Sequence, residues 1–176
     1  VLSKFVNVLP DYSDAEIIVL HSKQVFGQSE YQNCPSLKLL VTTTSGIDHI
    51  DIGFLSTQGV RMVRMPKVRR DAVVETTLAL LLNATRLVWR FHSDAKKNVW
   101  SRDKLEDYAP KRLQDLKVGI VGCGVIGRRL ISVLEAFGVQ LFAADPLGVP
   151  KNVEEMSFAQ MGRECDAVVL LCDLNP

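Results

Sequence analysis

A glycine-rich turn at Gly122–Gly127 has the spacing in this 176-residue sequence that most directly suggests chemistry. The turn reads Gly-Cys-Gly-Val-Ile-Gly and joins an apolar stretch typical of a strand, 117–121, to a segment typical of a helix. Gly122 permits a tight turn, Gly124 lets a pyrophosphate approach the backbone, and Gly127 lets the helix pack on its strand. The free N–H groups at such a helix start favour an anion. The residues of this predicted dinucleotide site are Gly122, Cys123, Gly124, Val125, Ile126 and Gly127.

The next predicted strand, 139–145, ends in an acid where such sites bind a ribose. Asp145 follows Gly127 by 18 residues, and its carboxylate can accept hydrogen bonds from ribose hydroxyls. The same carboxylate would repel a 2′-phosphate, and no arginine follows in the next residues, Pro146-Leu147-Gly148. We therefore predict that the cofactor is NAD rather than NADP, with Pro146 beside it. The weaker alternative is that the glycines serve only a tight strand–helix turn.

Composition places the chain among ordinary soluble proteins of one or two small domains, because 47% of its residues are hydrophobic and 23% are charged. A net charge of +1 gives no basic surface for nucleic acid or membrane. The apolar runs are too short to span a bilayer, and no signal peptide is evident. The four cysteines lack CxxC or metal-ligand spacing, which predicts reduced thiols in a cytoplasmic protein and no metal site.

The first third of the sequence predicts a small parallel α/β layer. Apolar runs at 15–21, 37–42 and 60–63 fit strands, and 52–58 fits a short helix. A single layer of this size fits a compact unit that precedes the glycine-rich turn.

The middle of the sequence predicts one long helix over 71–97, which contains neither Gly nor Pro, with Asp71 as its N-cap. Residues 97–112 fit an irregular arm. The dinucleotide unit starts near Leu113, and its third strand is expected at 166–172. With only three strands, the first one is expected to lie at an open edge of its sheet. We therefore expect the chain to be part of a longer protein.

Four stretches, in order, are similar to those of one family. They are Ser45-Gly46-Ile47-Asp48-His49-Ile50-Asp51; Pro66 with Val73-Val74-Glu75; the dinucleotide motif 116–138 with Ala144-Asp145-Pro146; and 165–176. With these motifs the chain resembles the D-isomer-specific 2-hydroxyacid dehydrogenases from about residue 14 to its last residue. It departs from the family at Val74, Asp173 and Asn175, where alanine, proline and threonine are usual.

The resemblance implies an α/β fold with two parts: a Rossmann-like doubly wound parallel sheet that binds NAD and a smaller flavodoxin-like substrate domain. It implies a substrate domain over 1–68, an interdomain helix and dimerisation arm over 69–112, and the first half of the Rossmann domain over 113–176. Trp89 and Trp100 flank a polar stretch of this arm, and large aromatics are enriched at interfaces. We expect a homodimer; the alternative is that both rings pack within the protomer.

The activity implied by the resemblance is hydride transfer between NAD and C2 of a 2-oxo or 2-hydroxy acid. In the family a catalytic Arg, Glu and His follow the position of the last residue here. No catalytic residue is therefore expected in this chain, which is expected to be inactive as given. Cys172 and Asp173 are expected near the adenosine pocket. The alternative is an NAD-sensing, corepressor-like binding protein of the same fold.

The turn at Ser45–Asp51 is the expected substrate anchor. By resemblance, the backbone N–H groups of Ser45, Gly46 and Ile47 bind the substrate carboxylate, and consecutive N–H groups at such a turn can form an anion nest. The alternative is that Gly46 only permits a turn before the helix. His49 is the histidine nearest to this site, although an ordinary hydrogen bond fits it better than substrate contact. Asp48 and Asp51 are the expected caps of the helix at 52–58.

A local basic cluster follows the third predicted strand. Such a run is usually a solvated face. The alternative is that Arg69 or Arg70 binds a second anionic group, which would make the substrate doubly anionic. The cluster consists of Arg61, Arg64, Lys67, Arg69 and Arg70.

Overall fold

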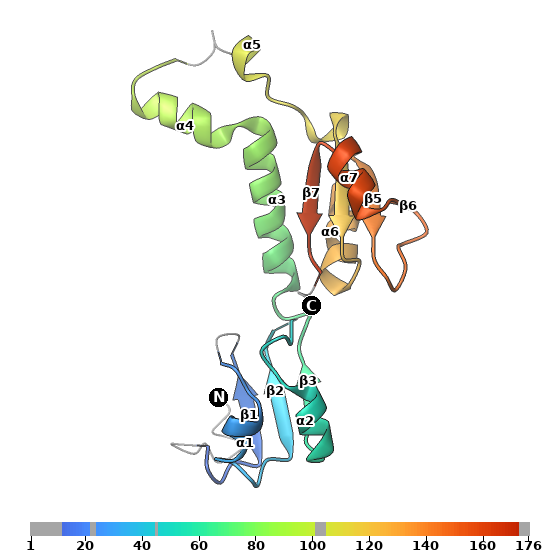
Figure 1. Cartoon of the computed structure of the whole chain (residues 1–176). Helices are drawn as coiled ribbons and strands as arrows, with labels where there is room; N and C mark the ends of the chain where they lie inside the picture. The colour runs from blue at the N-terminus through green and yellow to red at the C-terminus, as the bar shows by residue number, and fades with distance from the viewer. Residues whose placement is uncertain (1–11, 22–23, 45, 101–104, 173–176) are drawn as a thin grey trace. The chain divides into compact units, whose positions relative to one another are not determined.

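The computed structural model describes residues 12–21, 24–44, 46–100 and 105–172 (Figure 1). The chain divides into two compact units, a first unit that ends at Arg69 and a second unit that spans Arg70–Cys172.

The first unit is a three-stranded parallel sheet in the order β1-β2-β3. Its register pairs Leu20 with Thr42 and Thr42 with Arg64, so all three strands end at one carboxyl edge. The predicted strands and the helix at 52–58 are present, whereas the short helix α1 was not predicted. The elements are β1 Ile17–Leu20, α1 Gln28–Tyr31, β2 Leu39–Thr42, α2 Ile52–Thr57 and β3 Arg61–Arg64.

Both helices of the first unit cover the same face of its sheet. Tyr31 of α1 and Phe54 of α2 meet edge to face, with ring centroids 5.6 Å apart. Of the two predicted caps of α2, Asp51 is the one that acts, because its Oδ1 accepts the Phe54 N–H at 2.9 Å. The buried core beneath the helices consists of Leu20, Phe26, Cys34, Leu37, Leu40, Ile50, Leu55 and Val60.

The second unit contains a four-stranded parallel sheet in the order β6-β5-β4-β7. The expectation that the first strand, 117–121, lies at an open edge is wrong, because β5 and β7 pair with it on either side. The edge beyond β5 is occupied by β6, a strand of only two residues that is too short to give a hydrophobic pattern. After β6 the chain crosses over to the other side of β4 and adds β7 there. This reversal in the order of strand addition is typical of a doubly wound sheet. The strands are β4 Lys117–Val121, β5 Gln140–Ala144, β6 Glu154–Glu155 and β7 Ala167–Leu170.

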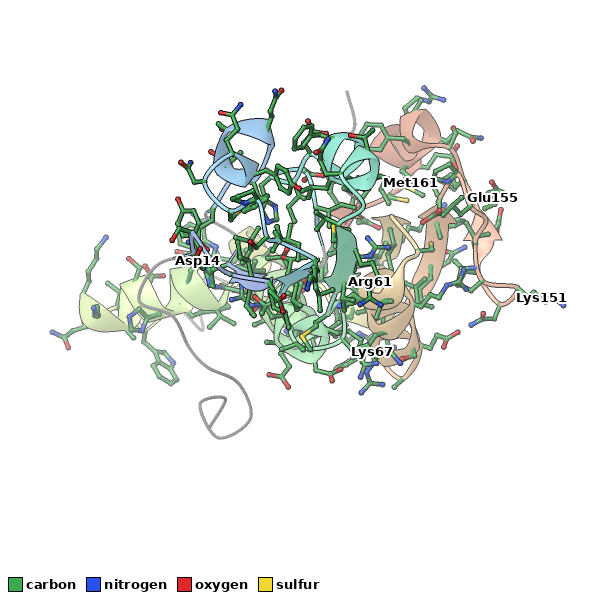
Figure 2. The ribbon with its side chains drawn as sticks, turned by 90° about the horizontal axis from the view of Figure 1, so that it is seen from below. Asp14, Arg61, Lys67, Lys151, Glu155 and Met161 are labelled. Atoms are coloured by element: carbon green, nitrogen blue, oxygen red, sulfur yellow. The ribbon has the colours of Figure 1, made fainter. Side chains whose placement is uncertain are left out.

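Helices α6 (Val125–Glu135) and α7 (Phe158–Glu164) connect these strands. Met161 of α7, labelled in Figure 2, is fully buried over β4. Its sulfur would lie 2.8 Å from a Cβ at Gly119, so the Met161 side chain would have to shift to admit any larger residue there. The four cysteines of the chain are free in the structure.

The expectation of one helix over 71–97 is wrong. The structure has α3 (Arg70–Arg86) and α4 (Val88–Lys96), which are bent by 66°. They are separated by Leu87 at a φ of 54°, in the left-handed region. Asn83 Oδ1 accepts the Trp89 N–H at 3.0 Å and so caps α4. Because the break uses neither Gly nor Pro, the sequence carried no signal for it.

Asp71 was expected at the helix N-cap, but it lies within the first turn because α3 begins at Arg70. Its carboxylate binds Arg70 Nη2 at 2.9 Å and Arg129 Nε of α6 at 3.4 Å. The pKa of Asp71 is therefore below its usual value, with the Arg70 hydrogen bond as the main cause. These contacts tie the start of α3 to α6.

The arm after α4 contains a short helix, α5 (Leu105–Tyr108), where an irregular segment was expected. Tyr108 donates to Asp94 Oδ2 at 2.9 Å, and its ring lies 4.1 Å from the Arg90 guanidinium carbon. The arm is thereby docked on α4. Among the described residues, no single helix is long and apolar enough to cross a membrane, although the bent pair α3 and α4 would pass together on length and composition alone.

Asp166 fastens the amino end of β7 to that of β4. Its Oδ2 accepts the Lys117 N–H at 3.0 Å, and its Oδ1 accepts Lys111 Nζ at 2.9 Å. The Lys117 N–H, followed by Lys111, lowers the pKa of this carboxyl below its usual value. Because its pKa is lower in the folded state, the Asp166 carboxylate stabilises the fold at pH values above its unfolded pKa of about 3.9. This contribution is lost as the pH falls through the folded pKa.

We expect Asp166→Asn to unfold at a lower urea concentration than wild type at neutral pH, and the difference to shrink as the pH falls below the unfolded pKa of about 3.9 and through the lower folded pKa. Urea unfolding followed by circular dichroism at both pH values measures this difference. Glu164→Gln, a charge loss two residues away, controls for net charge. An Asp166→Asn difference that stays constant across the pH range would rule out a role for the ionised carboxylate.

Candidate functional site

The turn after β4 requires glycine at two positions for reasons within the protein. Gly122 has a φ of +99°, and a Cβ there would lie 2.7 Å from the backbone of Leu171 and Cys172. A Cβ at Gly127 would lie 2.0 Å from the Gly122 carbonyl oxygen, so α6 could not pack this closely on β4. Gly124 differs, because no atom lies within 4 Å of its hypothetical Cβ. Gly122 and Gly127 serve the fold, and Gly124 leaves space beside the backbone.

Helix α6 begins directly at that space, with Gly124 as its N-cap residue. Within the described residues, no side chain caps this helix start. The N–H groups of its first turn, from Val125, Ile126 and Gly127, therefore remain for an anion, and the helix dipole favours negative charge there. The site also lies where the strand order reverses around β4, the usual ligand position in a doubly wound sheet.

Asp145 is held beside the glycine turn by backbone hydrogen bonds. One carboxylate oxygen accepts the Cys123 N–H at 2.6 Å and the other accepts the Leu147 N–H at 2.8 Å. A carboxylate offers about four lone-pair positions, so each oxygen keeps capacity for another donor. Asp145 is half-buried and Pro146 beside it is exposed. The carboxylate is thus fixed in place and can still accept from a diol.

The thiol of Cys123 packs within this site. Its side chain is buried, and the burial, followed by the negative charge of Asp145, raises its pKa above the usual value. A thiol that stays protonated is a poor nucleophile. Cys123 therefore contributes packing and its backbone N–H. Cys172, two residues after the neighbouring strand β7, is exposed, whereas the predicted cofactor residue Asp173 lies outside the described residues.

The second predicted binding region is the carboxyl edge of the first unit. Thr42 and Thr44 are buried, and their hydroxyls hydrogen-bond to each other at 2.7 Å. The Thr44 hydroxyl also donates to the Gly46 carbonyl at 2.7 Å, which fixes the turn. Neither the Gly46 N–H nor the Ile47 N–H donates to any described carbonyl. Both can serve an anion, while the predicted Ser45 lies outside the described part of the chain.

The two arginines predicted to bind substrate have different partners. Arg69 Nη2 lies 3.0 Å from Nε2 of His21, within the first unit. Arg70 belongs to the second unit, where its Nε and Nη2 donate to the two carboxylate oxygens of Asp71 at 3.0 and 2.9 Å. Arg61, the first residue of β3, and Lys67, which follows that strand, are both exposed and are labelled in Figure 2.

Sequence reasoning missed the pairing of His21 with Arg69. The available signal was that both residues follow strands of one parallel sheet and must therefore lie at the same edge. His49, the expected nearest histidine, has its Nε2 buried without a hydrogen-bond partner in the described structure. Its backbone carbonyl accepts the Phe26 N–H at 2.9 Å. Among the described residues, no group of three or more His, Cys, Asp or Glu side chains could hold a metal ion.

Comparison with known proteins gives consistent matches. Residues 78–176 match the family model "D-isomer specific 2-hydroxyacid dehydrogenase, NAD binding domain". The D-3-phosphoglycerate dehydrogenase of Methanocaldococcus jannaschii is 26% identical over 148 residues, which cover 84% of this chain and 28% of that protein. The glyoxylate reductase/hydroxypyruvate reductase of Mus musculus is 30% identical over 148 residues, covering 80% and 45%.

A solved structure matches as well. The D-lactate dehydrogenase of Aquifex aeolicus, complexed with NAD and lactic acid, superposes with a TM-score of 0.84 at 25% identity and covers 93% of this chain and 50% of that one. The chain therefore spans between about a quarter and a half of the length of these relatives.

Proposed function

This chain belongs to the D-isomer-specific 2-hydroxyacid dehydrogenase family, and from that premise we propose that the native protein is an NAD-dependent oxidoreductase. It transfers a hydride between the cofactor and a 2-hydroxy or 2-oxo acid. The observation that carries this proposal is the combination of an open glycine turn at a helix start with a fixed carboxylate beside it, at the switch point of a doubly wound sheet.

The residues of the second unit fit NAD. The first turn of α6 would bind the pyrophosphate in the space beside Gly124, and Asp145 would accept the ribose hydroxyls. Pro146 and Cys172, with Asp173, would border the adenosine. When bound, the cofactor supplies or accepts the hydride. The chain's own residues hold and orient it, and a negative Asp145 disfavours the 2′-phosphate of NADP.

The first unit would bind the acid substrate. The N–H groups of Gly46 and Ile47, together with Ser45, would hold its carboxylate in the turn after β2. A doubly anionic substrate would place its second charged group on Arg69, whose described partner is the ring of His21 rather than a carboxylate. Arg70 is the weaker candidate, because Asp71 already occupies its guanidinium.

We expect Arg69→Ala to raise KM for a doubly anionic 2-oxo acid by about tenfold, the loss expected for one charged hydrogen bond. KM for a singly charged 2-oxo acid should change little. Arg70→Ala should raise KM for the dianion less, because its guanidinium is engaged by Asp71. Steady-state NADH oxidation with 2-oxoglutarate and with pyruvate measures both values. If neither variant raises KM for any dianion, the cluster is only a solvated surface.

The assembly and location of the protein are also proposals. Trp89 in α4 and Trp100 in the arm that follows α4 are 57% and 79% exposed, which leaves large aromatic surface on the helix and the arm. We propose that this arm joins two protomers into a homodimer of a cytoplasmic enzyme. Light scattering that shows a monomer at micromolar concentration would argue against the dimer.

The experiment for the proposed function is NADH oxidation by the native protein with a panel of 2-oxo acids, monitored at the NADH absorbance band. We expect turnover with at least one acid and much less with NADPH. Turnover with none of them, together with tight NADH binding, would instead support an NAD-sensing, corepressor-like protein. We expect the 176 residues alone to bind NADH without turnover, since the resemblance places no catalytic residue among them.

A further inference from the structure

We propose that His21 is a positioning residue that holds the Arg69 guanidinium over the substrate turn and thereby makes the first unit selective for doubly anionic acids. This inference rests on the proposed function and names the substrate class of that site. Its basis is one contact, Arg69 Nη2 to His21 Nε2 at 3.0 Å, between segments 48 residues apart.

The contact bridges the carboxyl edge of the sheet. His21 follows β1 and Arg69 belongs to the segment after β3, while the order β1-β2-β3 places the end of β2 between them. The register aligns Leu20, Thr42 and Arg64 at that edge. The segment that leaves β2 is the turn with the available Gly46 and Ile47 N–H groups. A guanidinium fixed on the same edge suits the second charge of an acid whose first carboxylate lies in the turn.

The chemistry of the pair fixes the state of the histidine. An arginine side chain has donors and no acceptor, so Nε2 must accept the hydrogen bond. The imidazole is therefore neutral, with its proton on Nδ1. The backbone N–H of His21 donates to Gln24 Oε1 at 3.1 Å, which helps to set the position of His21 after β1. A neutral acceptor orients the guanidinium and leaves its positive charge for a ligand, which a carboxylate partner would cancel.

The test compares three variants of the native protein. His21→Phe removes the acceptor and keeps a flat ring, whereas His21→Gln keeps an acceptor near the Nε2 position. Arg61→Ala, an exposed arginine at the opposite end of β3, controls for net charge. Each is assayed with NADH for KM and kcat toward 2-oxoglutarate and toward pyruvate.

We expect His21→Phe to raise KM for 2-oxoglutarate by about threefold to tenfold, with kcat and the pyruvate KM nearly unchanged. His21→Gln should restore most of that loss, and Arg61→Ala should have no effect. His21→Phe should add little in an Arg69→Ala background, since it acts through the guanidinium. Equal losses for both acids, or no rescue by glutamine, would overturn the positioning role.

A second readout does not depend on turnover. Long-range proton–nitrogen NMR correlations of the histidine ring should show the Nδ1–H tautomer of His21 in wild type, and Arg69→Ala should weaken this preference. A ring protonated on Nε2 at neutral pH would contradict the proposal directly. If wild type reduces no 2-oxo acid while the tautomer is as expected, the proposed function fails but the contact stands. If wild type is active and the variants do not discriminate, only this inference fails.

Discussion

Gly124→Ala is expected to weaken NADH binding by at least about tenfold while the second unit folds with nearly wild-type stability. The structure separates the two effects, because no protein atom lies within 4 Å of the added Cβ and Gly124 has a φ of −69°, which alanine adopts readily. The Cβ would occupy the space through which the pyrophosphate approaches the backbone. A loss of about 1.4 kcal/mol corresponds to the tenfold change. NADH titration by fluorescence, with urea unfolding of the same sample, measures both.

Gly127→Ala should behave differently. Its Cβ would meet the Gly122 carbonyl oxygen at 2.0 Å, so α6 must move away from β4. Overpacking of this kind costs about 1–3 kcal/mol, and the variant should lose both stability and NADH binding. Gly162→Ala in α7 is the matched control, because that Cβ meets nothing and alanine favours a helix by up to about 1 kcal/mol. Unchanged NADH affinity in Gly124→Ala would show that the turn serves the fold alone.

Asp145→Asn is expected to change which nucleotide binds. The neutral amide loses the charged acceptor for the ribose hydroxyls, which should cost about 1.5–3 kcal/mol, or about tenfold to a hundredfold in the Kd of NADH. The repulsion of a 2′-phosphate disappears at the same time, so NADPH affinity should rise. The asparagine oxygen can still accept the Cys123 N–H, whereas its amide nitrogen cannot accept the Leu147 N–H, so the side chain keeps one of its two backbone hydrogen bonds.

Asp115→Asn is the control for this exchange. Asp115 precedes β4, at the amino edge of the same sheet, and pairs with Arg112 at 2.8 Å. Asp115→Asn removes one negative charge from the second unit, as Asp145→Asn does, and should leave the affinities for NADH and NADPH unchanged. Calorimetric titration of both variants with NADH and NADPH gives the ratio of affinities. A ratio that is the same in wild type and Asp145→Asn would mean that Asp145 does not select the nucleotide.

Much of the dinucleotide unit could be predicted because its signals are local. Gly122, Gly124 and Gly127 sit between a buried strand and an amphipathic helix, and β4 begins and ends at the predicted residues. Asp145 could be placed from its distance along the chain. The roles of the individual glycines needed coordinates, because sequence spacing does not show that one Cβ has open space and another meets a carbonyl.

The parts that could not be predicted depend on tertiary contacts. The break at Leu87 uses a residue that usually favours helix, and its left-handed φ is compensated by the Asn83 cap on α4. The position of β7 beside β4 follows from a chain crossing that no hydrophobic period encodes. The pairing of His21 with Arg69 was also missed: the strand order places both residues at one edge of the sheet, but only coordinates show that their side chains meet.

The central claim is that the glycine turn and Asp145 form an NAD site in this chain, and nucleotide binding tests it most directly. Purified residues 1–176 are titrated with NADH and, in parallel, with NADPH, and binding is followed by calorimetry. Saturable NADH binding at one site per chain, with NADPH at least about tenfold weaker, is the predicted result. Equal affinity for the two nucleotides, or no saturable binding of NADH by folded protein, would contradict the account.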